Sequence, residues 1–471
     1  MFRHALTLLL TLTFLLPLSA QAEEGESPLT HAEAVELVSK ECVSVEDWRR
    51  AFGWKGSSGY DVARFKPNSG IMSQSCVTPF FLTVDTLILE RVIRLAPYMH
   101  DIQVIMFFGG MVELKKLLSD LPNLDEVKSL EVKTDDVLSN AVFPVLVGEM
   151  SKLSEVSLYA GGFTSVPDVL ATKRLSRIEY GQSWKSRDEG NDFIIHSDFF
   201  NLISSDVIAV TARNPIRVVG GVGNVKYNSF ELRVYRNRSA RSLVSRQFVK
   251  LWPWMSKSKS ITVNLPNRAD LPDNLFSSSD VEEMSLYFMC APKHEVDCNF
   301  PKPSKVNLIL RNLSIRDAMG YRIGEGFELL KSLNDFKLFE SGGATIHPDL
   351  FDAPNLSNIS VYGKISGEWP NKFDIPKGLT HVWITLSNEQ SFPSTLADLP
   401  KGASLNVESR RKFNADWALG KPFSRWAVPL ISGFPPKLCR RYWNNELKLS
   451  GRMSTVCKVI DNALKPAAPT P

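Results

Sequence analysis

The side chains best placed to do chemistry form a row of aromatic residues. Tyr159, Tyr235, Tyr287, Phe339 and Tyr362 each follow a short apolar pattern, equivalent to Leu-x-x-Leu-x-Leu, at the same position. Aromatic side chains that stand free of a core supply a large contact area at low entropic cost, and they are enriched at interfaces. The row therefore predicts recognition of another macromolecule.

Charged and aromatic residues lie beside this row. His381 and Trp383 occupy two further positions of the same pattern, and Arg233 and Arg311 are interspersed with the tyrosines. Glutamates stand close by in the sequence. A mixture of both charges suits a protein partner better than a polyanion, and a glycan remains the second kind of partner that we consider.

Known catalytic motifs do not explain the sequence. It contains no G-x-S-x-G, no Walker loop and no H-E-x-x-H, and the cysteines form no C-x-x-C. We therefore expect no enzyme activity, no cofactor and no metal site. One enzymatic alternative stays open, a polysaccharide hydrolase or lyase of the β-helix type. It would need clustered carboxylates or basic residues on one face of successive coils, and Asp335 and Glu340 keep this option open.

The apolar pattern recurs at a fixed spacing. The openings at Leu333, Leu356 and Leu379 are separated by 23 residues each, and those at Leu153 and Leu175 by 22. Prolines stand in frame, eight or nine residues ahead of the next opening, at Pro144, Pro167, Pro272, Pro348, Pro370 and Pro393. Each unit predicts a short strand followed by a short helix or 3₁₀ turn, and such units bury their apolar faces by stacking.

These units resemble the leucine-rich repeat family, in its exported bacterial type with proline-containing repeats. The stretches "TIHPDLFDAPNLSNISVY" and "KISGEWPNKF" are similar to the repeats of that family. The resemblance implies an α/β solenoid over residues 101–408, a horseshoe with a parallel β-sheet on its concave face and the aromatic row on that face. A parallel β-helix is the structural rival.

Capping regions are expected at both ends of the solenoid, over residues 23–100 and 409–464, because terminal repeats need their cores covered. Six cysteines allow 15 connectivities. Their spacing favours three local disulfides, of which the first and the last would staple the caps. The expected pairs are Cys42–Cys76, Cys290–Cys298 and Cys439–Cys457.

The first 22 residues have a basic start, a short apolar run and an Ala-x-Ala site, which is typical of a secretory signal peptide cleaved after Ala22. We expect an exported protein, periplasmic or secreted, without a transmembrane anchor. The tail 465–471 is predicted to be disordered. With 55 basic and 51 acidic residues the net charge is +4, which argues against a nucleic-acid surface. A purely structural role in the cell envelope is the third hypothesis.

Overall fold

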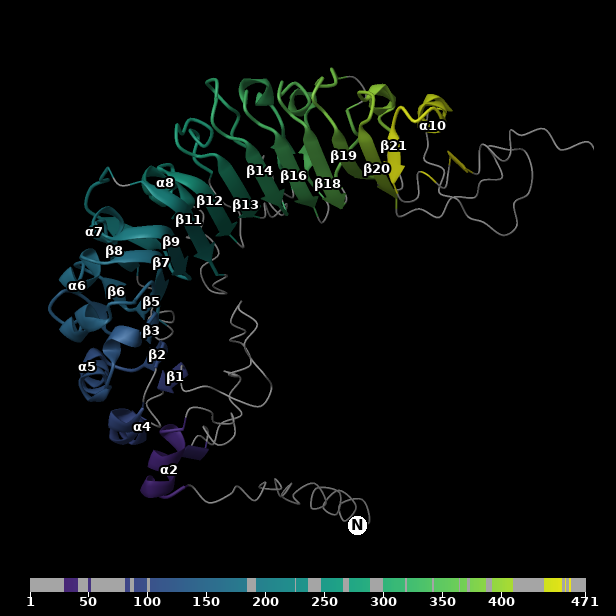
Figure 1. The fold of residues 1–471 in the computed structure, drawn as a ribbon. Coiled ribbons are helices and arrows are strands. Elements are labelled where there is room, and N and C mark those ends of the chain that lie inside the picture. The colour runs from purple at the N-terminus through teal and green to yellow at the C-terminus, as the bar shows by residue number, and fades with distance from the viewer. Residues whose placement is uncertain are drawn as a thin grey trace, which may run out of the picture.

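The protein folds around one long parallel sheet, seen in a computed structural model. The described residues are 29–40, 50–51, 81–84, 89–99, 102–183, 192–224, 226–235, 247–265, 271–288, 300–317, 320–340, 343–363, 365–370, 373–386, 392–409, 436–450, 454 and 457–458. Figure 1 shows these residues as an arc, with the strands of the main sheet on its inner side. This is a mixed α/β, solenoid-like architecture.

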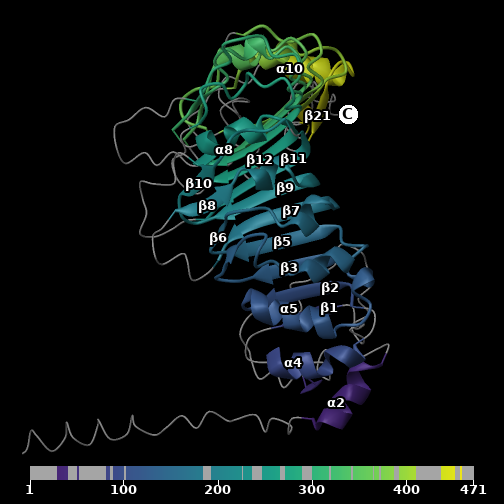
Figure 2. The same cartoon turned by 90° about the vertical axis from the view of Figure 1, so that its left-hand side faces the viewer.

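The main sheet has 15 strands within the described residues, and every neighbouring pair is parallel. In spatial order, which follows chain order, they are β1 (Phe81–Val84), β2 (Val104–Phe108), β3 (Ser129–Lys133), β5 (Glu155–Ala160), β7 (Arg174–Gln182), β9 (Ser204–Ala212), β11 (Tyr227–Val234), β12 (Ser258–Leu265), β13 (Glu283–Phe288), β14 (Asn312–Arg316), β16 (Asp335–Glu340), β18 (Asn358–Gly363), β19 (His381–Leu386), β20 (Ser404–Ser409) and β21 (Lys448–Ser450). Figure 2 shows the first of these strands as successive rungs.

The predicted repeat sets the register of the sheet. Asp335, Asn358, His381 and Ser404 pair with one another in turn, each 23 residues after the last. Within a unit, side chains alternate between the core and the opposite face, as a strand requires. Phe336 is fully buried, and every apolar residue at the matching position of the neighbouring strands is buried as well.

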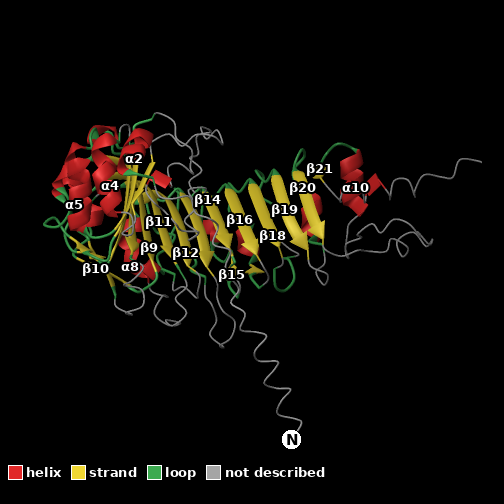
Figure 3. Ribbon diagram, turned by 90° about the horizontal axis from the view of Figure 1, so that it is seen from below, coloured by secondary structure: helices red, strands yellow, loops and turns green. Residues whose placement is uncertain are grey.

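Short helices and minor sheets lie on the outer side of the arc (Figures 1 and 3). The outer elements are α4 (Leu89–Leu95), η2 (Ala96–Tyr98), α5 (Met111–Asp120), η3 (Leu124–Glu126), η4 (Val145–Glu149), α6 (Asp168–Ala171), α7 (Asp198–Asn201), α8 (Gln247–Met255), η6 (Phe327–Leu329), η7 (Pro348–Leu350) and η8 (Ser394–Asp398). A second parallel sheet has the order β10 (Ile216–Val219), β8 (Phe193–His196), β6 (Gly162–Phe163), β4 (Val137–Leu138), and β15 (Arg322–Ile323) pairs with β17 (Thr345–Ile346). Among the described residues, the second sheet accompanies only part of the arc, whereas a regular β-helix repeats its sheets in every coil.

Four of the six in-frame prolines begin short outer helices, as predicted, whereas Pro272 precedes a turn and Pro370 begins no described helix. Pro144, Pro167 and Pro393 are the N-cap residues of η4, α6 and η8, and Pro348 is the first residue of η7. Proline suits this place because its fixed φ is already helical and its missing N–H would have no partner there. The proline thus marks the point at which the chain turns back toward the sheet.

The sheet is continuous through the middle of the chain, where the sequence pattern is weakest. Arg174 pairs with Ser204, which lies 30 residues further on, because β8 and α7 are inserted between β7 and β9. Aromatic side chains fill the enlarged core of this region. Tyr180 packs edge-on against Phe163 and Phe199, and its hydroxyl donates to the Phe199 carbonyl at 2.8 Å. A longer unit therefore joins the same sheet without a break.

The two ends carry small helical elements. At the N-terminal end, α2 (His31–Val38) begins with a capping box between Thr30 and Glu33. At the C-terminal end, α10 (Pro436–Trp443) holds Cys439, which forms a disulfide with Cys457 as predicted. The main sheet reaches into both expected capping regions, since β1 and β21 lie outside residues 101–408.

Several sequence predictions fall outside the described residues. They are the signal peptide 1–22, the cysteines 42, 76, 290 and 298, and the tail 465–471. Within the described part of the chain, no helix is both long and apolar enough to span a lipid bilayer. The Cys439–Cys457 disulfide is the kind of bond that persists in oxidising compartments.

Candidate functional site

The candidate site is the concave face, which we define as the face of the main sheet on the inner side of the arc. Its side chains are those that alternate with the buried ones along each strand. On β16, for example, Phe336 and Leu338 point into the core, while Lys337 and Phe339 are half-buried on the concave face. Two groups of side chains dominate this face, one on each half of the arc.

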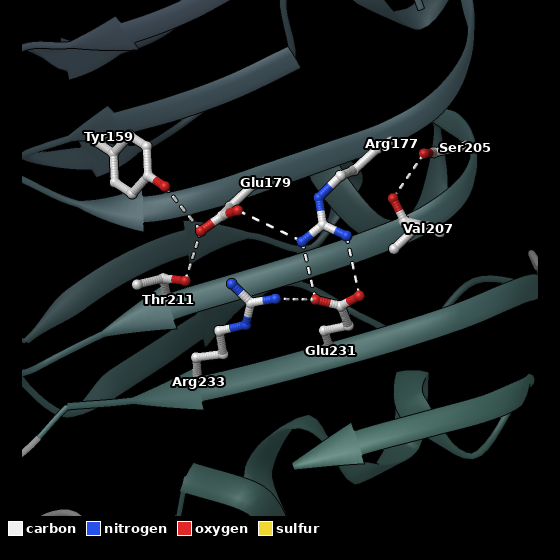
Figure 4. Close-up of polar contacts among 8 residues, drawn as sticks. All are labelled: Tyr159, Arg177, Glu179, Ser205, Val207, Thr211, Glu231 and Arg233. Atoms are coloured by element: carbon white, nitrogen blue, oxygen red, sulfur yellow. Dashed lines mark hydrogen bonds and ion pairs between the residues drawn. The ribbon is translucent and has the colours of Figure 1, made fainter. Parts of the chain in front are cut away.

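The first group, the charge network, lies on β5 to β11 and consists of Tyr159, Arg177, Glu179, Thr211, Glu231 and Arg233 (Figure 4). Its centre is a two-pronged ion pair. Arg177 donates to both carboxylate oxygens of Glu231, at 3.0 and 2.9 Å, across the intervening strand β9. Arg233 donates to one of the same oxygens at 2.8 Å. The planar guanidinium matches the carboxylate, which makes this pair stronger than a single contact.

A second carboxylate completes the network. Glu179 is only 7% exposed, and one of its oxygens accepts hydrogen bonds from the Tyr159 hydroxyl at 2.9 Å and from the Thr211 hydroxyl at 2.7 Å. Its other oxygen lies 3.6 Å from an Arg177 nitrogen. A buried charge is stable only when it is paired and hydrogen-bonded in this way.

One glycine permits this arrangement. The ring of Tyr159 lies against Gly181 on the next strand, where an added Cβ would come within 2.0 Å of a ring carbon. A larger residue at this position would push the tyrosine away from Glu179. Lys133 approaches the same ring, with its Nζ 5.3 Å from the ring centroid.

The pKa values of the network follow its contacts. The hydrogen bond with Glu231 raises the pKa of Arg177, and the hydrogen bond with Arg177 lowers the pKa of Glu231. Burial, and then the nearby Glu179 charge, raises the pKa of the Tyr159 hydroxyl well above its usual range. All three groups are thus held in their ordinary ionisation states, which favours a structural network over proton transfer.

The second group, the aromatic ladder, lies on β14 to β19 and consists of Arg316, Phe339, Tyr362 and Trp383. The rings of Phe339 and Tyr362 are stacked at 4.8 Å with planes 12° apart. Trp383 lies 5.1 Å from Tyr362, and the Arg316 guanidinium lies 4.7 Å from the Phe339 ring centroid. Four side chains from four neighbouring strands therefore form one continuous row, which is stacked at Phe339 and Tyr362 and tilted by 50° at Trp383.

A hollow of ≈ 520 Å³ opens beside the ladder on β12 to β14. It is lined by Thr262, Val263, Asn264, Ser285, Leu286, Tyr287, Ser314 and Arg316. The neighbouring Asp317 accepts a hydrogen bond from the Tyr287 hydroxyl, which raises the pKa of that tyrosine. The volume is within the range of ligand sites, roughly 300–1,000 Å³.

The structure brings together three of the residues predicted from sequence, Phe339, Tyr362 and Trp383, with Tyr287 two strands before the first of them. Other predicted residues lie apart. Tyr159 and Arg233 belong to the charge network, as described above. Tyr235 is 47% exposed and lies two residues beyond Arg233. Arg233 pairs with Asn264, which pairs with Tyr287, so Arg233 and not Tyr235 is in register with Tyr287.

The last two predicted residues, Arg311 and His381, lie at the N-terminal ends of β14 and β19, away from the ladder. Arg311 is exposed immediately before β14, with a nitrogen 3.9 Å from Glu282, and His381 is exposed at the start of β19. Neither contributes to the ladder through any described contact. The predicted residues are thus divided among four places: the charge network, the ladder with Tyr287, Tyr235 just beyond β11, and the starts of β14 and β19.

Sequence reasoning missed Arg177, Glu179, Glu231 and Arg316. For Arg316 a signal was present, because "NLSIR" ends in the same alternation that places Phe339 on the concave face. For the network no local signal exists, since Arg177 and Glu231 are 54 residues apart in units of irregular length.

Comparison with protein-family models gave no match for this chain, and comparison with curated proteins likewise gave none. Among the described residues, no group of three or more histidine, cysteine or acidic side chains is arranged to hold a metal ion. The geometry of the concave face is therefore the basis for the functional argument.

Proposed function

We propose that this is an exported leucine-rich repeat protein that binds another protein through the concave face of its solenoid, without catalysing a reaction. The observation that carries the proposal is the aromatic ladder, an ordered row of three rings and one guanidinium on successive strands. Aromatic residues and arginine are the residue types most enriched at binding hot spots.

The family assignment within this proposal rests on the 23-residue register and on the prolines that begin the outer turns. Export is supported by the sequence of the first 22 residues and by the C-terminal disulfide. An exported binding protein of bacterial type would meet either an envelope protein or a host protein.

Capture from envelope and host-cell extracts tests the proposal. The wild-type chain is compared with the ladder variant, Phe339→Ala, Tyr362→Ala and Trp383→Ala, after both are shown to unfold at similar temperatures. We expect one protein to be retained by the wild type and lost by the variant.

A matched control replaces exposed apolar residues outside the concave strands, Val306→Ala and Leu308→Ala, which are 56% and 66% exposed. This control should retain the captured protein. Equal capture by the wild type and the ladder variant would remove the ladder from the proposal. Capture of nothing by any variant would instead favour a structural envelope component, and retention of a polysaccharide would favour the glycan alternative.

A further inference from the structure

The hollow beside the ladder contains hydrogen-bonding groups that the protein itself does not use. Thr262, Ser285 and Ser314 present hydroxyl groups at the same register position of three adjacent strands. Among the described residues, none of these three hydroxyls has a hydrogen-bond partner. Such donors and acceptors are free to bind a ligand that lies along the sheet.

One ionised side chain, Arg316, belongs to the lining of the hollow. Arg316 is exposed, and within the described part of the chain no carboxylate forms an ion pair with it. Asp317 is engaged by the Tyr287 hydroxyl, and Glu283 accepts a hydrogen bond from Asn312 at 2.9 Å. The lining is therefore complementary to an anion, for which a guanidinium offers two parallel donors.

Phe339 and Tyr362 present ring edges rather than ring faces. The faces of Phe339 are occupied by Arg316 on one side and by Tyr362 on the other, and Tyr362 is enclosed between Phe339 and Trp383. Sugars stack on open ring faces, so these two rings are a poor glycan platform. Ring edges carry partial positive charge, which suits carbonyl and carboxylate oxygens.

We infer that the hollow and the ladder together bind an extended acidic segment of a protein partner. A carboxylate of the segment pairs with Arg316, its backbone lies over the hydroxyls of the hollow, and an apolar side chain packs at the Trp383 end. From β14 to β19 there are three strand spacings, about 14 Å, which corresponds to about four residues of extended chain. This inference rests on the proposed function and specifies its ligand.

Selection of random displayed peptides by the full-length chain tests this inference. We expect enriched peptides to carry Asp or Glu about four positions from an apolar residue, as the strand spacing requires. In Arg316→Gln the acidic preference should disappear, and affinity for a synthesised wild-type-selected peptide should fall about tenfold or more. Arg316→Lys keeps the charge and should retain part of that affinity.

Arg322→Gln is the matched control, since it removes an exposed arginine of β15, outside the main sheet, and should change nothing. Enrichment without acidic residues, an unaltered preference in Arg316→Gln, or no enrichment would overturn the inference. Binding of oligogalacturonate in place of peptides would do so as well. If the ladder variant loses a captured protein that Arg316→Gln still binds fully, the proposed function stands and this inference fails.

Discussion

The two halves of the concave face use the same strand positions for opposite purposes. On β5 to β11 the polar side chains satisfy one another, so that Glu179 is nearly buried although it lies on the face away from the core. On β12 to β14, within the described part of the chain, the hydroxyls of Thr262, Ser285 and Ser314 have no hydrogen-bond partner and Arg316 has no ion-pair partner. On β14 to β19 the aromatic rings and Arg316 form the ladder. A charge network that is internally paired rigidifies a sheet, whereas unpaired groups remain available to a ligand.

This difference separates the residues that stabilise the fold from the residues that are available for binding. Removing a member of the network leaves a partner charge unpaired in a poorly hydrated place, which costs folding energy. Removing a member of the ladder or the hollow exposes little that was buried. The first half should therefore respond to mutation in its stability, and the second half in its binding.

The largest effect on stability is expected for Arg177→Ala. It leaves Glu179 without a cation and removes both contacts to Glu231, so the free energy of unfolding should fall by about 3 kcal/mol. Urea titration followed by circular dichroism measures this. Arg174→Ala, an exposed arginine on the same strand, is the control and should change stability by less than about 0.5 kcal/mol. If Arg177→Ala lost no more unfolding free energy than Arg174→Ala, the charge network would not stabilise the fold.

A smaller loss, about 2 kcal/mol, is expected for Glu231→Gln at neutral pH, because the charge-assisted hydrogen bonds to Arg177 become neutral. This loss depends on pH in a defined direction. The folded-state pKa of Glu231 is lowered, so its contribution is complete above the unfolded value of about 4.3 and is lost as pH falls through the folded value.

The difference in unfolding free energy between wild type and Glu231→Gln should consequently shrink as the pH is lowered from about 6 toward 3. Chemical unfolding at several pH values measures the trend. A difference that stays constant or grows in acid would contradict the assigned ion pair.

Tyr159→Phe should destabilise the protein by about 1 kcal/mol, the net contribution of one hydrogen bond. The effect is modest because Glu179 keeps the Thr211 hydroxyl and the nearby Arg177. The double variant Tyr159→Phe, Thr211→Val leaves Oε1 of Glu179 without either hydroxyl donor. Its loss of unfolding free energy should exceed the sum of the losses in the two single variants. Simple additivity would show that the two hydroxyls act independently.

The smallest effect on stability is expected in the ladder. Tyr362→Leu removes both ring contacts but keeps an apolar side chain, so the free energy of unfolding should fall by about 0.5 kcal/mol. A loss as large as that of Arg177→Ala would indicate that the ladder serves the fold, and the contrast between the halves would disappear.

The regular part of the fold could be predicted from sequence because its signals are local. The spacing of Leu333, Leu356 and Leu379 gave the strand positions, and the in-frame prolines gave the outer turns. The same alternation placed Phe339 and Tyr362 side by side. These features depend only on the period of the repeat and on the two-residue alternation of a strand.

The charge network could not be predicted, because it depends on the register between units of unequal length. Glu179 and Thr211 meet only after the insertion of β8 and α7 has been accommodated, and no property of either residue alone indicates the contact. The unequal lengths of the units also misplaced Tyr235 in the predicted aromatic row. The observed register gives that position to Arg233.

The central claim, that binding and stability are divided between the two halves, is tested most directly by titrating the captured protein into three chains by calorimetry. The chains are the wild type, the ladder variant and Arg177→Ala, all at a temperature where each is folded. We expect the affinity of the ladder variant to fall by about 100-fold or more and that of Arg177→Ala to remain at the wild-type value. Equal weakening in both variants, or weakening in Arg177→Ala alone, would contradict the account.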